Sequence, residues 1–349
     1  MTYRAGDTLL QLERIGSTAG NGVTTADDTY YYAEAAPEAL SSLLWLEARR
    51  MAFAAAEMTD GDLERERKIV VHEWRERSGQ DAEWQESLWA GVYPAGHPYR
   101  QPLDRVHEVE RTGLAHVQWF TQSHYRPERA HLVVVGRFDA ELARAWIEQY
   151  FGQIRGTGPA ATRSTPKPAQ LSEVATVRHY ALVAHESLAV IWPGPARGSR
   201  EFAALNVAAE LVSGLLDQRL VAGQGPASRA EATLEGREHD SWFVIDVTAR
   251  GERKAETMLE EIDAVLQAVQ SGALGAGLLE LATRTLRKSR MRPSLAERAL
   301  YRARLPAGTP PEADTTSYQA MDLAAVQSAL QRWLPSGRRV IGIAERDWQ

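Results

Sequence analysis

Residues 27–36 read DDTYYYAEAA, and residues 240–250 read DSWFVIDVTAR. Each stretch is an aromatic or β-branched run that follows acidic residues, a pattern typical of a β-strand. Each is followed by apolar residues at helical spacing, over 39–53 in the first half and 255–269 in the second. The same order of elements in both halves predicts two related α+β domains, each an antiparallel sheet packed against helices.

A segment with almost nothing to bury separates the two halves. Residues 155–170 read RGTGPAATRSTPKPAQ, and this Gly, Pro, Ser and Thr content is typical of a linker. We therefore expect a first domain at 1–158, a linker at 159–172 and a second domain at 173–349. Within the first domain, the apolar run AHLVVVGRF at 130–138 predicts a buried strand.

Composition and charge exclude several classes of protein. The chain is 44% hydrophobic and 25% charged, which is ordinary for a soluble globular protein. Its net charge is -6 and no basic block stands out, so nucleic acid is not expected as a partner. With no cysteine, disulfides, thiolate zinc sites and cysteine nucleophiles are excluded. No apolar run reaches membrane-spanning length, so we expect a soluble protein, cytoplasmic or periplasmic.

Two carboxylates interrupt the pattern of the helix predicted at 64–77, ERERKIVVHEWRER. At about 100° per residue, Glu66 and Glu73 fall inside the arc that holds Val70 and Ile69. A buried carboxylate is costly unless it is paired or bound to a metal. One interpretation is that arginines pair with these glutamates or that the helix edge is exposed. The other is a metal ligand or a pair of catalytic carboxylates.

Histidine distinguishes these interpretations, because a zinc site without cysteine normally needs two imidazoles. The nine histidines form neither H-E-x-x-H nor H-x-x-E-H anywhere in the sequence. By itself, the sequence therefore contains no complete metal site.

Four blocks, taken together, resemble the M16 (pitrilysin or insulinase-like) zinc metallopeptidases. They occur in the family's order at plausible spacing, and the second half is similar to the family's non-catalytic domain. The blocks are GNGVTTADDTYYYAEAAPEALSSLLWLEARRM (20–51), LERERKIVVHEWRER (63–77), YPAGHPYRQPL (93–103) and HYRPERAHLVVVGRFD (124–139).

The resemblance implies roles for particular residues. In the family, an H-x-x-E-H helix supplies two zinc ligands and the general base for peptide hydrolysis. Glu73 matches the third zinc ligand, and Glu66 matches a supporting carboxylate two turns earlier. The family's substrate-binding strand, which takes up peptide by β-augmentation, maps onto Asn21, Gly22, Val23, Thr24 and Thr25.

The departure from the family pattern concerns its catalytic helix. We expect the H-x-x-E-H helix to lie upstream of the first residue, so that this chain is incomplete at its start. A lone Glu73 does not hold zinc with useful affinity, and no general base remains. We therefore expect the chain alone to bind no zinc tightly and to cleave no peptide.

Three hypotheses for function remain. The chain is a shortened form of an active M16 peptidase, or a non-catalytic M16 subunit that binds peptide or unfolded protein and pairs with an intact subunit. The third hypothesis, an unrelated α+β binding module, ranks below these two. Substrate preference, compartment and oligomeric state stay open.

Overall fold

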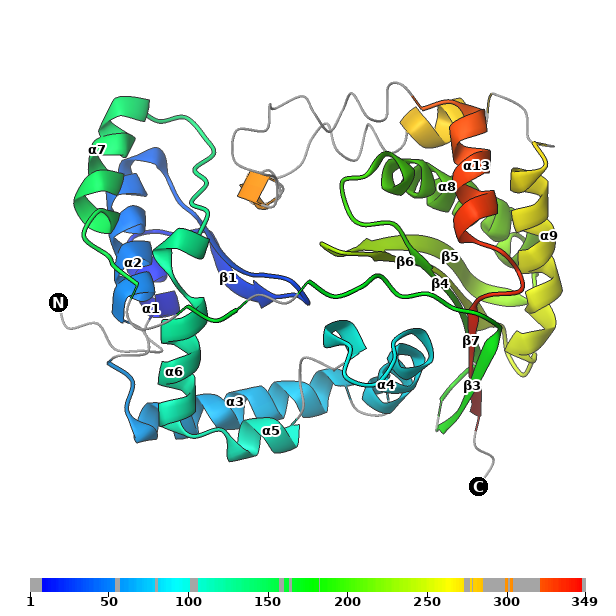
Figure 1. Ribbon diagram of the computed structural model, residues 1–349, viewed down its shortest axis with the longest axis horizontal. Coiled ribbons are helices and arrows are strands. Elements are labelled where there is room, and N and C mark those ends of the chain that lie inside the picture. The colour runs from blue at the N-terminus through cyan, green and yellow to red at the C-terminus, as the bar shows by residue number, and fades with distance from the viewer. Residues whose placement is uncertain are drawn as a thin grey trace. The chain divides into compact units, whose positions relative to one another are not determined.

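The computed structural model shows an α+β protein and describes most of the chain (Figure 1). The described residues are 8–53, 57–78, 81–100, 106–156, 160–162, 165–181, 183–272, 277, 279–284, 299–300, 302–303 and 321–346. None of the helices within these ranges is both long and apolar enough to cross a membrane.

The chain divides into two compact units that are not continuous in sequence. Unit 1 comprises residues 1–77, 103–164 and 293–309, and unit 2 comprises the remainder. The change from one unit to the other after residue 164 falls within the linker expected at 159–172. Residues 78–102, by contrast, were expected in the first domain and belong to unit 2.

Unit 1 contains a two-stranded hairpin and several helices. Its elements are α1 (Thr8–Arg14), β1 (Ala19–Thr24), β2 (Thr29–Glu34), η1 (Pro37–Ala39), α2 (Leu40–Phe53), α3 (Asp60–Ser78), α5 (Val106–Arg111), α6 (Leu114–His124), η3 (Pro127–Arg129) and α7 (Ala140–Phe151). β1 and β2 are antiparallel, and α2 packs against α7, where the hydroxyls of Ser41 and Tyr150 lie 2.9 Å apart. Leu44 and Leu46 are buried on α2.

The strand predicted at 130–138 does not form in unit 1. Residues 131–135 make no sheet pairing with the described strands, and the Leu132 side chain is 45% exposed. A strand needs a neighbour for its backbone hydrogen bonds, and an apolar run alone does not supply one.

Unit 2 is built on a five-stranded sheet in the order β3-β7-β4-β6-β5. β3 and β7 are parallel, and the other pairs are antiparallel. Its elements are α4 (Asp81–Val92), η2 (Pro98–Arg100), β3 (Ala175–Ala181), β4 (Ser187–Gly194), α8 (Arg200–Leu216), η4 (Asp217–Val221), β5 (Ala227–Gly236), β6 (Ser241–Ala249), η5 (Ala255–Met258), α9 (Leu259–Gln270), α13 (Leu323–Trp333) and β7 (Val340–Arg346).

Helices cover both faces of this sheet. α8, α9 and α13 lie over one face (Figure 1), where Leu205, Val265 and Leu330 belong to a large buried cluster. α4 packs on the other face against β3, β7 and β4, with Leu88 and Val92 buried there. These apolar contacts explain why residues 78–102 belong to unit 2.

Candidate functional site

Helix α3 carries both of the candidate carboxylates. Thr59 and Asp62 start the helix by a reciprocal cap, in which Asp62 N donates to Thr59 Oγ1 at 3.2 Å and Thr59 N donates to Asp62 Oδ2 at 3.0 Å. Asp60 and Asp62 in the first turn also suit the positive end of the helix dipole. The cap fixes where α3 begins and therefore which residues share a face.

Arg67 determines the face by which α3 packs. Its guanidinium donates to Thr112 O at 2.6 Å and to Val109 O at 3.2 Å, and it also pairs with Glu64. Half-buried Leu63 and Trp74 lie beside Arg67 on the helix wheel. A charged residue thus lies at the centre of the packing face, because backbone carbonyls satisfy its donors.

Glu66 and Glu73 lie to one side of that face. Glu66 is half-buried at its margin, and Glu73 is exposed. The apolar residues of their arc are exposed too, with Ile69 47% and Val70 38% accessible. The structure therefore places both glutamates on one side of α3, on an apolar strip that the described residues leave open to solvent.

The donors around these glutamates do not by themselves fit a zinc ion. Zinc in proteins takes at least three nitrogen, oxygen or sulfur ligands. Among the described residues, no three His, Cys, Asp or Glu side chains gather in a metal-holding group. His72 is exposed on the same helix, and its Nδ1 lies 3.5 Å from Glu76 rather than beside Glu73.

The predicted peptide-binding residues form β1 and the start of its turn. Thr25 N donates to Asp28 O at 2.8 Å and closes the two-residue loop of the hairpin. Opposite residues in an antiparallel pair alternate between hydrogen-bonded and non-hydrogen-bonded pairs. This bond therefore determines which residues along the hairpin form hydrogen-bonded pairs. Gly20, Gly22 and Thr24 then direct their backbone groups away from β2.

Few side-chain atoms cover this outer edge of β1. Gly20 and Gly22 contribute none, and Tyr31 from β2 lies across Gly22, with ring carbons 3.0 Å from where a Cβ would stand. Gly22 N already donates to its neighbour Asn21 Oδ1 at 2.8 Å. Asn21 therefore holds one outward donor of an edge that no other described strand covers.

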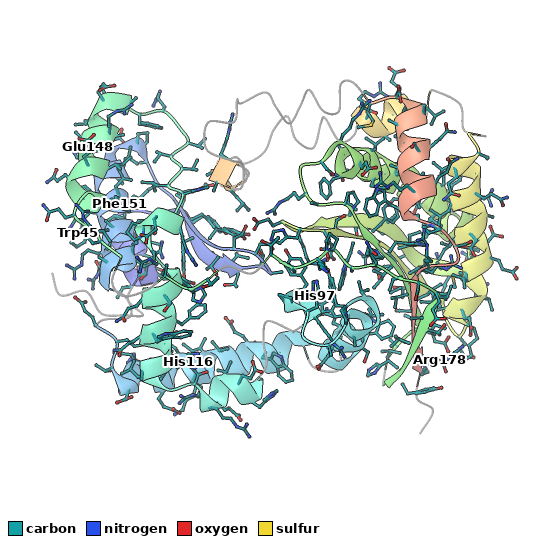
Figure 2. All side chains as sticks on the ribbon, viewed as in Figure 1. Trp45, His97, His116, Glu148, Phe151 and Arg178 are labelled. Carbon is teal, nitrogen blue, oxygen red and sulfur yellow. The ribbon has the colours of Figure 1, made fainter. Side chains whose placement is uncertain are left out.

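A second polar cluster lies in unit 2 and was not predicted from the sequence. Asp240 is fully buried; Tyr93 OH donates to its Oδ2 at 2.9 Å, and Trp242 Nε1 donates to Tyr93 OH at 2.9 Å. Burial raises the pKa of Asp240, while Arg237 and the Tyr93 hydrogen bond lower it. The ring of His97, which is labelled in Figure 2, stacks on the Tyr93 ring with 4.4 Å between the ring centroids. Tyr93 and His97 both belong to the block YPAGHPYRQPL at 93–103, and they were the sequence signal of this cluster.

Comparison with protein families gives one match, over the middle of the chain. A family model described as the peptidase M16 inactive domain matches residues 114–286. No curated protein matches the sequence significantly.

Solved structures share the fold along nearly the whole chain. A protease from Helicobacter pylori is 18% identical, with a TM-score of 0.89 over 99% of this chain and 86% of that one. A peptidase M16 inactive domain from Pseudomonas fluorescens is 17% identical, with a TM-score of 0.81 over 98% and 84%. The first half of the periplasmic protease PqqL from Escherichia coli is 16% identical, with a TM-score of 0.73 over 96% and 77%. Residues 114–286 thus match the peptidase M16 inactive domain, and the chain has an M16-like fold along almost its whole length.

Proposed function

We propose that this chain is a non-catalytic M16 subunit that binds extended peptide along the outer edge of β1. The observation that carries the proposal is that, among the described strands, β1 pairs on one side only, with β2, while its outward groups belong to Gly20, Gly22 and Thr24. Such an edge takes up an extended peptide by main-chain hydrogen bonds. A peptide strand would compete with Asn21 Oδ1 for the Gly22 N–H.

The non-catalytic part of the proposal is supported by the sequence and by the α3 donors. The chain has nine histidines but no H-x-x-E-H, and Glu66 and Glu73 are the family-matched carboxylates without the family's imidazoles. In this proposal the chain holds peptide, and an intact M16 subunit in the same assembly cleaves it.

A second candidate function is that of a peptidase whose histidines come from outside these residues. It is favoured by Glu66 and Glu73 lying on one side of α3, beside the exposed Ile69 and Val70. Uncovered apolar residues next to carboxylates suit a surface that another helix covers.

Peptide binding to the β1 edge is tested with a labelled unfolded peptide and fluorescence anisotropy. Thr24→Pro removes one outward N–H, and we expect it to weaken binding at least tenfold. Ala33→Pro makes the same change on the opposite edge of the hairpin and should leave this binding unchanged. Equal affinities for the wild type and Thr24→Pro would refute the assignment of the β1 edge.

Catalysis is tested by metal analysis and a peptidase assay on the same preparation. We expect substoichiometric zinc and no cleavage by the chain alone, and cleavage after mixing with an M16 subunit that carries H-x-x-E-H. Stoichiometric zinc with cleavage by the chain alone would contradict the non-catalytic role. If the wild type cleaves peptide, alone or in the mixture, and Glu73→Gln does not, the result would favour the second candidate function.

A further inference from the structure

The sequence contains two asparagines, and one of them precedes a glycine. Asn21 lies on β1 and is followed by Gly22, whereas Asn206 lies on α8 and is followed by Val207. An asparagine side chain reacts with the backbone nitrogen of the next residue most readily when that residue has no Cβ to hinder the approach. Asn21 is therefore the asparagine whose side chain the sequence leaves open to this reaction.

The structure places the reacting groups of Asn21 and Gly22 next to each other. Gly22 N donates to Asn21 Oδ1 at 2.8 Å, so the carboxamide carbon Cγ, which bears Oδ1, lies beside the same nitrogen. Both residues are exposed, so water reaches them. Two groups that are already held in contact need little further ordering before they react.

The Gly22 nitrogen takes no part in the pairing of the hairpin. Its N–H is directed away from β2, and no described strand pairs with β1 on that side. A nitrogen in a hydrogen-bonded ladder would first have to leave its acceptor. Asn206 shows the contrast, because it is half-buried on α8 and the next nitrogen, that of Val207, belongs to the helical ladder.

We propose that Asn21 is a site of self-modification, which converts to aspartate and isoaspartate through a succinimide. The Gly22 nitrogen gives its proton to solvent and attacks Asn21 Cγ, so that a new C–N bond forms. The C–N bond of the side-chain amide breaks, and the amide leaves as ammonia. One water molecule then opens the ring at either carbonyl, which gives aspartate or isoaspartate. The net reaction consumes one water and releases one ammonia, and it needs no oxidant or reductant.

Either product changes the β1 edge that is proposed above to bind peptide. Aspartate adds a negative charge beside the outward backbone groups. Isoaspartate adds one atom to the main chain, which disturbs the register of Gly22 and Thr24 against a bound strand. This consequence rests on the proposed function, whereas the modification itself does not.

The test is incubation of the full chain in mildly alkaline buffer, followed by peptide mapping with mass spectrometry. We expect the fragment with residue 21 to gain about 1 Da as the amide becomes a carboxylic acid, and the fragment with Asn206 to keep its mass. Because an unpaired edge needs no local opening, the folded chain should react within about tenfold of the rate of the free peptide 17–26, STAGNGVTTA. Asn21→Gln is the matched control and should keep its mass, because its longer side chain cannot close the five-membered ring.

A folded chain that reacts more slowly than this limit, or equal mass gains at positions 21 and 206, would overturn the proposal. The modified protein, separated by ion exchange, should bind the labelled unfolded peptide at least about tenfold more weakly than fresh protein. Unchanged affinity would overturn the consequence for the β1 edge. If fresh protein binds no peptide while residue 21 still gains mass, the proposed function fails and the modification site is supported.

Discussion

At the residue scale, Asp246 places a poorly solvated carboxylate on a central strand of the sheet. It lies on β6 opposite Glu231 of β5 and Ala189 of β4. Burial raises its pKa to about 6; Arg229 opposes this, and Glu235 and Glu231 add to it. Folding therefore favours the protonated form of this side chain.

Asp246→Asn should stabilise the protein at neutral pH and change how stability depends on pH. The folded state keeps the Asp246 proton up to about pH 6, whereas the unfolded state releases it near 3.8. The stability that this proton contributes is fully present below pH 3.8 and is lost as the pH rises through 6. We expect a gain of about 1–3 kcal/mol at pH 7.5 that vanishes near pH 4.

The measurement is urea unfolding of both proteins across that pH range. Glu260→Gln, on the exposed side of α9, is the matched control and should show no such pH-dependent gain. A variant curve parallel to the wild type at all pH values would contradict the shifted pKa.

At the element scale, α4 approaches the sheet of unit 2 closely because glycines lie at the contact. A Cβ on Gly342 of β7 would meet Leu88 and would come within 2.6 Å of Trp84 Cη2. A Cβ on Gly91 of α4 would lie 3.0 Å from Val340 Cγ1. The two glycines set how near the helix and the strand can lie.

Gly342→Val should therefore force α4 away from β7 and destabilise unit 2 by about 1–3 kcal/mol. Denaturant unfolding gives the size of the loss, and faster amide exchange in α4 gives its location. Gly337→Val is the control, because no atom beyond the two neighbouring residues lies within 4 Å of the Cβ it would add. Equal losses in both variants would show that glycine flexibility, not close packing, is what matters at position 342.

Elements could be predicted from the sequence where their signal is local. β2, β6, α3 and the helices that follow β2 and β6 lie where the local sequence pattern places them. The prediction of a paired strand at 130–138 is wrong, because pairing depends on a neighbouring strand that no local pattern reveals. The packing face of α3 is centred on Arg67, and no local pattern predicts this. The carbonyls of Val109 and Thr112 that accept from Arg67 are remote in sequence.

At the scale of the whole molecule, the two units differ in how much they bury. Both clusters of buried apolar residues in the described structure lie in unit 2. Unit 1 buries a few residues, among them Leu12, Leu44 and Leu46. Because apolar burial is the dominant favourable contribution to folding, unit 1 should be the less stable unit.

We therefore expect unfolding in two transitions, with unit 1 unfolding first. Amides of β1 and β2 should exchange faster with deuterium than those of β4 and β6 under native conditions. Mass spectrometry of exchange along a urea titration separates the two units. A single transition with equal protection of both hairpins would contradict this expectation.

By itself, the sequence determined the α+β class, the likeness to the M16 family and the pair Glu66 and Glu73. These depend on periodicity, composition and motifs, which are properties of neighbouring residues. Only the tertiary structure decided that residues 78–102 belong to unit 2 and that Ile69, Val70 and Leu132 are exposed. Burial and strand pairing are contacts between remote segments, so a pattern can say that a residue is apolar but not what covers it.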